Sequence, residues 1–178
     1  MQPILTGMRI IEGSAFIAAP MCGMTLAQLG ADVIRFDQIG GGIDYSRWPV
    51  TSENNSIYWA EMNKGKRSIA VNIRSDAGRE LIADLICAPG DNAGIFSTNL
   101  PATGMLAYEE LSLRRPDLIQ HEIVGNRHGT SALDYTVNAK VGFPFVTGRQ
   151  DDERPVNHVL PAWDIACAYH AAVDILAA

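Results

Sequence analysis

The stretch MRIIEGSAFIAAPMCGMTLAQLGADVIRFD, residues 8–37, decides the fold class. Its first five residues, 8–12, form a short apolar run that predicts a buried strand. Good helix formers follow and predict a helix over about residues 19–29, which Gly30 ends. Residues 32–37 predict a second strand. Strand, helix and strand in this order, with short connections, indicate a parallel β-α-β unit and therefore an α/β sheet.

The rest of the chain continues the pattern. Further strands are predicted at residues 67–73, 92–97 and 116–124, and further helices at residues 76–87, 108–115 and from Asp164 to residue 178. Ser75 is expected to cap helix 76–87. The apolar face of that helix is expected to consist of Leu81, Ile82, Leu85 and Ile86. Residues 42–62 and 126–136 are expected to be irregular.

The composition is typical of one folded domain. Of the 178 residues, 47% are apolar and 19% are charged. A net charge of −6 argues against non-specific nucleic-acid binding, which needs Lys and Arg to neutralise phosphates. No run reaches the roughly 18 apolar residues that span a bilayer, and the N-terminus has no secretory signal pattern. We therefore expect a cytoplasmic protein without a nucleic-acid or membrane partner.

The cysteines and histidines show no spacing typical of a metal or disulfide site. Cys22, Cys87 and Cys167 are far apart and odd in number, and no C-x-x-C pair occurs. The four histidines do not form an H-E-x-x-H pattern. The sequence therefore predicts a reduced protein without a metal.

Two segments could hold the phosphates of a nucleotide ligand. In the turn at residues 12–20, small side chains allow close backbone approach, and the following helix would present free N–H groups to an anion. Efficient strand–helix packing explains the same composition. Residues 63–68 place three cations in four positions, and a solvated loop is the alternative there. The glycines at residues 40–42 fit no phosphate-binding pattern.

Asp164 admits two interpretations. Aspartate is among the best N-cap residues and contributes about 1 kcal/mol at the start of a helix. A carboxylate can also be a covalent nucleophile toward an activated acyl group. Its neighbours Pro161, Ala162 and Trp163 would partly exclude water from such chemistry. A serine triad is not indicated, because no G-x-S-x-G pattern occurs.

Taken together, four segments make the sequence resemble the family III CoA-transferases. They are residues 5–12 (LTGMRIIE) with 18–20 (AAP), residues 29–35 (LGADVIR), residues 63–69 (NKGKRSI) and the Asp164 helix with its end at 175–178 (ILAA). Each is weak alone, but the combination runs nearly end to end. The resemblance implies a Rossmann-like parallel sheet with flanking helices, the N-terminal part of the family's large domain, over residues 1–178.

The resemblance also implies roles for individual residues. It assigns the nucleophile to Asp164, which would form an aspartyl anhydride and then an aspartyl-CoA thioester, with backbone N–H groups stabilising the oxyanions. The substrates would be an acyl-CoA and a carboxylic acid, with no metal. Coenzyme A is expected to lie against Ile17, Ala18, Val71, Asn72, Ile73, Arg74, Asn99 and Leu100.

Two positions depart from the family pattern. Racemases of the family carry a histidine before the aspartate of an HD pair, and Leu133 stands here beside Asp134. Two-base proton transfer needs an acid and a base on opposite faces of the α-carbon, so racemisation is disfavoured. Gln38 replaces an arginine often found where the second strand ends. One phosphate contact is therefore expected to be weaker.

Within the family, the sequence is most similar to the type that moves CoA between the two carboxyl groups of one branched C4-dicarboxylate, with mesaconyl-CoA as the expected substrate. The segments that carry this likeness are residues 12–16 (EGSAF), 47–50 (RWPV), 134–138 (DYTVN) and 157–164 (NHVLPAWD). The alternatives are an intermolecular CoA transferase acting on another acid, a catalytically silent CoA- or nucleotide-binding fragment, and an interaction domain without CoA affinity.

The resemblance implies a full-length protein that is longer than the present sequence and forms an intertwined homodimer. The family's smaller domain and returning C-terminal segment are therefore expected to be absent from residues 1–178. The last helix ends in apolar residues without a polar stop signal. It is expected to expose an apolar stripe and to promote self-association. The chain alone is expected to be inactive even if the complete enzyme is active.

Overall fold

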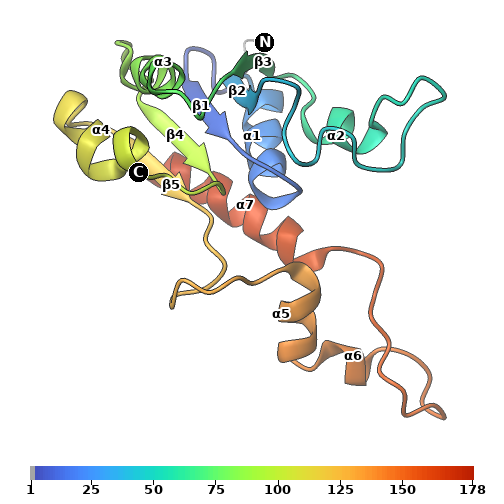
Figure 1. Ribbon diagram of the computed structural model, residues 1–178. Helices are drawn as coiled ribbons and strands as arrows, with labels where there is room; N and C mark the ends of the chain where they lie inside the picture. Colours follow the sequence, from blue (N-terminus) through green and yellow to red (C-terminus); the bar gives the residue numbers. More distant parts are fainter. Residues whose placement is uncertain (1–2) are drawn as a thin grey trace.

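Strand β1 (Arg9–Gly13) lies at the centre of a five-stranded parallel sheet in the computed structural model, which describes residues 3–178 (Figure 1). The strand order is β3-β2-β1-β4-β5. Ile11 is paired with Ile34 on one side and with Phe96 on the other. The other strands are β2 (Asp32–Gln38), β3 (Arg67–Val71), β4 (Ile95–Thr98) and β5 (Ile119–Glu122). The order reverses between β1 and β4, as in a Rossmann-like sheet.

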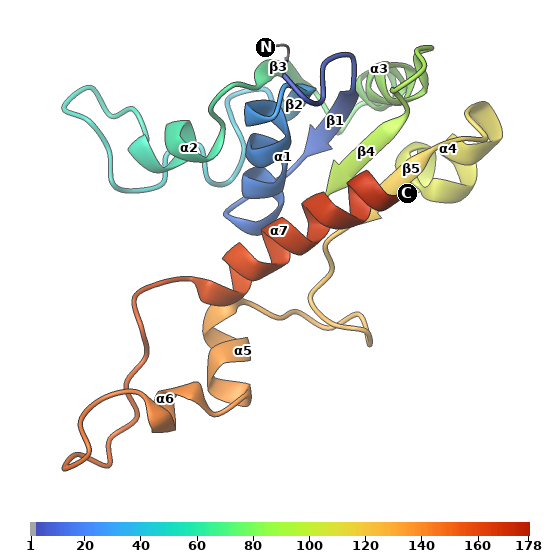
Figure 2. The ribbon, with the colours of Figure 1, turned by 180° about the vertical axis from the view of Figure 1, so that it is seen from behind.

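Helices cover both faces of this sheet. Helices α1 (Ala18–Gln28) and α7 (Ala162–Ala177) pack side by side on one face, and α3 (Asp76–Cys87) lies on the other. The shorter elements are α2 (Ile57–Met62), the 3-10 helix η1 (Gly104–Leu106), α4 (Tyr108–Arg114), α5 (Asp134–Lys140) and α6 (Phe143–Val146). Figure 2 shows α7 crossing beside α1 at an angle, while α5 and α6 extend away from the sheet.

Successive residues of the central strands fill two separate cores. Ile10 and Val33 pack with α1 and α7, whereas Ile11 and Ile34 pack with α3. This alternation is what a strand covered on both faces requires. Complete burial of one such side chain stabilises the fold by about 1.5–3 kcal/mol.

Small residues allow the helices to approach one another and the sheet. Ala168, Ala171 and Ala172 are the small buried residues where α7 packs against α1. Gly23 lies inside α1, where glycine normally weakens a helix. A Cβ atom at Gly23 would lie 1.6 Å from Oε2 of the buried Glu12, so the carboxylate under the helix requires glycine there.

A buried polar network joins β1 and β2 to the segment between β2 and β3. Arg35 is the largest fully buried side chain. Its guanidinium donates two hydrogen bonds of 2.9 Å to Asp37 and one of 3.3 Å to Asp44. It also donates to Ser14 Oγ and to Asn63 Oδ1, both at 3.0 Å. The buried charge is therefore both neutralised and hydrogen-bonded, which its burial requires.

The sheet and the long helices agree with the sequence predictions, with shifts at element ends. Helix 76–87 is α3, and Ser75 Oγ accepts the capping hydrogen bond from the Gly78 N–H at 3.1 Å. The strand predicted at 92–97 starts later, at Ile95, and the one predicted at 67–73 ends at Val71. Leu81 does not belong to the buried face of α3, because 47% of it is exposed.

Three short helices were not predicted. Helix α2 and the first three residues of α5 lie in segments predicted to be irregular, and α6 lies where no element was predicted. Helices α2, α5 and α6 contain only six, seven and four residues. Helices this short are not stable by propensity alone and depend on tertiary contacts, which leave little periodicity in the sequence. Predicting loops at residues 42–62 and at 134–136 was therefore wrong in part.

The predicted apolar stripe on the last helix is confirmed. Tyr169, Val173 and Leu176 follow helical spacing along α7 and are 51%, 63% and 46% exposed. Self-association through this stripe stays a prediction. Within residues 3–178, no helix is both long and apolar enough to cross a membrane.

Replacing Arg35 with methionine is expected to lower the free energy of unfolding by about 3–5 kcal/mol, because Asp37 and Asp44 would remain buried without their cation. Chemical denaturation followed by circular dichroism measures the change. Arg67→Met is the matched control. Arg67 also donates two hydrogen bonds to one aspartate, Asp32, but that pair is exposed, so a loss below about 1 kcal/mol is expected. Equal losses would contradict the role given to Arg35.

Candidate active site

The residues predicted to contact coenzyme A all lie at the carboxyl-terminal edge of the sheet. Parallel strands end at the same edge, and these residues come at or just after the ends of three of them. They are Ile17 and Ala18 after β1, Val71, Asn72, Ile73 and Arg74 at the end of β3, and Asn99 and Leu100 after β4. Strands β1 and β4 flank the point where the strand order reverses, which is where open α/β sheets bind ligands. Contact of these residues with CoA stays a prediction.

Asn99 fixes the turn between β1 and α1. Its Oδ1 accepts a hydrogen bond from the Ala15 N–H, and its Nδ2 donates to the Ala15 carbonyl, both at 2.8 Å. Thr98 Oγ1 donates to the Gly13 carbonyl at 2.6 Å beside it. The side-chain amide of Asn99 is therefore engaged with the protein's own backbone at two atoms, a role that the sequence did not reveal.

The β1–α1 turn contains a strained residue. Phe16 has a left-handed backbone with φ of 68°, which costs a non-glycine residue about 1–3 kcal/mol. Its N–H donates to Asp44 Oδ2 at 2.8 Å, which holds the turn in place. The N–H groups of Ile17 and Ala18 make none of the hydrogen bonds found in residues 3–178. Free donors thus lie at the start of α1, on the edge where a ligand would bind.

The cations of residues 64–67 do not form a shared anion site. Lys66 is buried, and its ammonium donates to Glu12 Oε1 at 2.6 Å and to the Pro20 carbonyl at 2.7 Å. Burial lowers the pKa of Lys66, and Glu12 opposes that change. Lys64 and Arg67 are paired with acidic side chains at the surface. Neither a phosphate cradle nor a solvated loop describes Lys66, which belongs to a structural ion pair.

Asp164 is the third residue of α7, and another aspartate caps the helix. Helix α7 begins at Ala162, and Pro161 occupies the N-cap position without a side-chain hydrogen bond. Oδ2 of Asp134 accepts from the N–H groups of Trp163 at 2.8 Å and of Asp164 at 3.3 Å. The interpretation of Asp164 as the N-cap was therefore wrong, because a residue distant in sequence satisfies these donors.

The Asp164 carboxylate is left available. It is half-buried and accepts none of the hydrogen bonds, and forms none of the ion pairs, found in residues 3–178. Burial raises the pKa of this carboxyl above its ordinary value, the charge of Asp134 raises it further, and Arg47 lowers it. A partly desolvated carboxylate without a structural partner is suited to nucleophilic attack.

Arg47 and Tyr58 complete the surroundings of Asp164. The Arg47 guanidinium lies over the rings of Phe16 and Tyr58, 5.4 and 4.6 Å from their centroids. The Tyr58 hydroxyl is buried and has no hydrogen-bond partner within residues 3–178. Burial raises the pKa of Tyr58 to about 12, and the charge of Asp164 acts in the same direction. The sequence drew attention to Arg47 only as part of the RWPV segment, and to Tyr58 not at all.

A buried amide supports the first turn of α7. Asn138 Oδ1 accepts from Trp163 Nε1 at 3.2 Å and lies 2.9 Å from His158 Nε2. The Trp163 ring meets Phe143 edge-on, with 5.4 Å between centroids. The α5–α6 segment therefore fixes the turn that carries Asp164.

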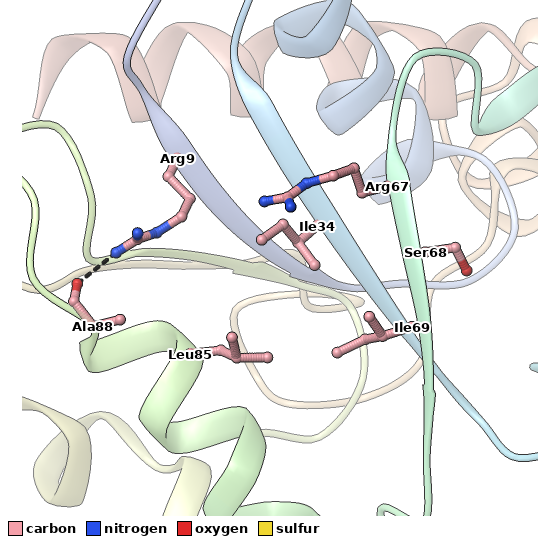
Figure 3. Close-up of a pocket in the computed structure, with 7 residues that line it drawn as sticks. All are labelled: Arg9, Ile34, Arg67, Ser68, Ile69, Leu85 and Ala88. Carbon is pink, nitrogen blue, oxygen red and sulfur yellow. Dashed lines mark hydrogen bonds between the residues drawn. The ribbon is translucent and has the colours of Figure 1, made fainter.

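The cavity in Figure 3 is not part of this site. It has a volume of about 400 Å³ and is lined by Arg9, Ile34, Arg67, Ser68, Ile69, Leu85 and Ala88. Arg9 and Arg67 begin β1 and β3, so the cavity lies at the opposite, amino-terminal edge of the sheet. Arg9 donates to the Ala88 carbonyl at 2.6 Å, and Arg67 is paired with Asp32. Both guanidinium groups are therefore already bonded to the protein.

The part of the chain that the structure describes, residues 3–178, contains no group of three or more His, Cys, Asp or Glu side chains that could hold a metal ion. Its three cysteines are free. Burial raises the pKa of the Cys22 thiol to about 12, so it is not a reactive thiolate. A reaction without a metal stays a prediction.

Comparisons with known sequences relate the chain to one family. The model of CoA-transferase family III matches residues 5–178. The chain is 59% identical to the 2-methylfumaryl-CoA isomerase of Chloroflexus aurantiacus, over 100% of this chain and 44% of that protein. It is 31% identical to the succinyl-CoA:mesaconate CoA-transferase of Haloarcula marismortui, over 98% of this chain and 47% of that protein. The chain thus spans less than half the length of either relative.

Solved structures agree with this result. A CaiB/BaiF family protein from Brucella suis has a TM-score of 0.87 and 27% sequence identity, covering 99% of this chain and 49% of that chain. The predicted α/β fold class and the resemblance described above are both confirmed.

Replacing Asp134 with alanine is expected to lower the free energy of unfolding by about 1 kcal/mol and to speed amide exchange at Trp163 and Asp164, because the α7 cap is lost. Denaturation and hydrogen–deuterium exchange measure the two effects. Asp134→Asn is the matched control, since asparagine caps about as well as aspartate. If both variants kept full protection of these amides, Asp134 would not be the cap.

Proposed function

The chain belongs to CoA-transferase family III, and we propose on that premise that it moves coenzyme A from one carboxyl group to another, with Asp164 as the nucleophile. The state of the Asp164 carboxylate is the observation that carries the proposal. It is half-buried and its pKa is raised. Asp134, and not Asp164, accepts the hydrogen bonds that cap the helix.

We propose mesaconyl-CoA as the substrate. The support is 59% identity over the whole chain to a 2-methylfumaryl-CoA isomerase, together with the mesaconate-specific name of a second relative. Mesaconate and 2-methylfumarate are the same branched C4-dicarboxylate. Donor and acceptor carboxyl groups would then belong to one molecule, and the net reaction would be an isomerisation.

The first half of the reaction transfers CoA to the protein. Asp164 attacks the thioester carbonyl, the carbon–sulfur bond breaks, and CoA leaves as a thiolate while a mixed anhydride forms. The thiolate then attacks the aspartyl carbonyl of the anhydride. The carbon–oxygen bond breaks, mesaconate is released as a dianion, and Asp164 is left as a CoA thioester.

The second half returns CoA to the other carboxyl group. That carboxylate attacks the aspartyl thioester and expels the thiolate, which forms a second anhydride. The thiolate then attacks the acyl carbonyl, gives the isomeric thioester and restores the Asp164 carboxylate. No step moves a proton, so the reaction does not need the histidine that Leu133 replaces.

Oxyanion donors would have to come from outside the start of α7. The N–H groups of Trp163 and Asp164 donate to Asp134, and those of Ala162 and Ile165 donate to backbone carbonyls. The free N–H groups of Ile17 and Ala18 are the donors that face the ligand-binding edge. We assign them to an anionic group of the bound thioester.

The proposed CoA path follows the carboxyl edge from Asn99–Leu100 past Ile17–Ala18 to residues 71–74. Gln38 Oε1 accepts from the Ile73 N–H at 3.2 Å. Gln38 therefore positions the turn after β3, and Arg74, which forms none of the guanidinium hydrogen bonds found in residues 3–178, is left to meet a phosphate.

Asp164→Asn in the natural gene product is expected to lower kcat by about three orders of magnitude or more, because the nucleophile is lost. Incubation with mesaconyl-CoA and hydroxylamine, followed by mass spectrometry, should place a hydroxamate on Asp164 of the unaltered protein only. Asp174→Asn is the control on the same helix. CoA binding without any adduct in the unaltered protein would favour a silent binding module.

The acid limb of the kcat/KM profile is expected to lie above the ordinary aspartate pKa of 3.8, because Asp164 must be ionised to attack and its pKa is raised. Activity is then lost as the pH falls through that raised pKa. Asp134→Asn removes a charge that raises the pKa, so the limb should move to lower pH. Arg47→Gln removes a charge that lowers it, so the limb should move to higher pH. Shifts in the same direction would contradict this electrostatic account.

A further inference from the structure

Within the described residues, 3–178, the Arg47 guanidinium has no carboxylate partner. It takes part in none of the ion pairs or hydrogen bonds found in residues 3–178, whereas Arg35, Arg67 and Arg79 all bind aspartates. Asp44 is only three residues away, but its two oxygens accept from Arg35 and from the Phe16 N–H. Arg47 is exposed, and Asp44 is already bonded to other groups. The N–H donors of Arg47 are therefore available to bind another anion.

The backbone of Arg47 is fixed. Its carbonyl accepts a hydrogen bond from Ser56 Oγ at 2.5 Å, and its N–H donates to the Asp44 carbonyl at 3.0 Å. Ser56 and Asp44 are both buried. Arg47 is therefore held by two residues that are themselves anchored, which limits the positions its side chain can reach.

Two aromatic rings also hold the guanidinium group. It lies over the aromatic faces of Phe16 and Tyr58. Stacking on rings uses the faces of a guanidinium and leaves the N–H donors in its plane free for a carboxylate, which they can bind as a two-pronged fork. The buried Tyr58 hydroxyl, which has no partner within residues 3–178, adds a second donor beside it.

Helix packing and charge relate these groups to the proposed nucleophile. Helix α1 follows Phe16 and packs along α7, which begins two residues before Asp164. Arg47 acts electrostatically on Asp164, and Tyr58 responds to the charges of both. The Arg47 guanidinium and the Tyr58 ring are thus in contact, and both lie near enough to Asp164 to feel its charge.

We propose that Arg47, together with the Tyr58 hydroxyl, binds the free carboxylate of a dicarboxylic acyl group and so selects dicarboxylic over monocarboxylic thioesters. This inference rests on the proposed function. While one carboxyl group reacts at Asp164, the other is held by Arg47. After mesaconate is released from the anhydride, it turns so that Arg47 holds the carboxylate that has just reacted. The other carboxylate then lies at Asp164. Because Arg47 holds one carboxylate, the dianion stays bound until the other attacks. The transfer is thereby kept within one molecule.

Calorimetric titration of the natural gene product tests this assignment. All variants carry Asp164→Asn, so that the thioester stays intact. The probes are mesaconyl-CoA and (E)-2-methylbut-2-enoyl-CoA, in which a methyl group replaces the free carboxylate. Arg47→Gln is expected to weaken mesaconyl-CoA binding about 10- to 100-fold, and to change binding of the methyl analogue less than about twofold.

Further variants sharpen the test. Tyr58→Phe should weaken mesaconyl-CoA alone, by about threefold to tenfold, because only a hydroxyl is lost. Arg149→Gln is the matched control, since Arg149 is exposed and paired only with Asp151, and it should change neither affinity. Equal weakening of both thioesters by Arg47→Gln, or no weakening, would overturn the carboxylate site.

The same variants separate this inference from the proposed function. If Asp164→Asn still isomerised mesaconyl-CoA while Arg47→Gln weakened that thioester selectively, the nucleophile would be wrong and the carboxylate site would stand. If Asp164→Asn were inactive while Arg47→Gln bound both thioesters normally, the nucleophile would stand and the carboxylate site would fall. Failure of mesaconyl-CoA to bind the unaltered protein would overturn both.

Discussion

The buried guanidinium of Arg35 is the constraint on which the arrangement of the site depends. Removing such a charge from water is unfavourable unless every donor is satisfied, and five hydrogen bonds to four side chains satisfy it here. One of those side chains, Asp44, also holds Phe16 in its left-handed conformation. By binding Asp44, the buried Arg35 fixes the turn between β1 and α1. It also fixes the segment that carries Arg47, whose N–H donates to the Asp44 carbonyl.

The sheet and its long helices could be predicted because their information is local or periodic. The short apolar runs of β1 and β2 and a serine before α3 are signals contained within a few neighbouring residues. The sequence could not show the interactions that join distant segments. Gly23 looks unfavourable for a helix until the Glu12 carboxylate is placed beneath it, and Lys66 looks like a surface cation until that carboxylate is its partner.

At the candidate site, too, local signals could be predicted and interactions between distant segments could not. Local reasoning made Asp164 a helix cap, since aspartate at a helix start usually is one. The resemblance to a family, and not the spacing of residues, indicated a nucleophile. Only the fold shows that Asp134, thirty residues earlier, caps the helix in place of Asp164. Arg47 and Tyr58 were overlooked for a similar reason, because a lone arginine and a lone tyrosine acquire meaning only from what they face.

The hydrogen bonds that the start of α7 donates to Asp134 also have an evolutionary consequence. They join the two ends of the segment that contains α5 and α6. Residues 134–163 therefore form a loop whose ends are held together by hydrogen bonds. The entropy of closing a loop grows slowly with its length, and doubling it costs only about 0.6 kcal/mol. Insertions and deletions between the tied ends can therefore accumulate among related proteins and reshape the surface around the substrate, while the reactive aspartate keeps its place.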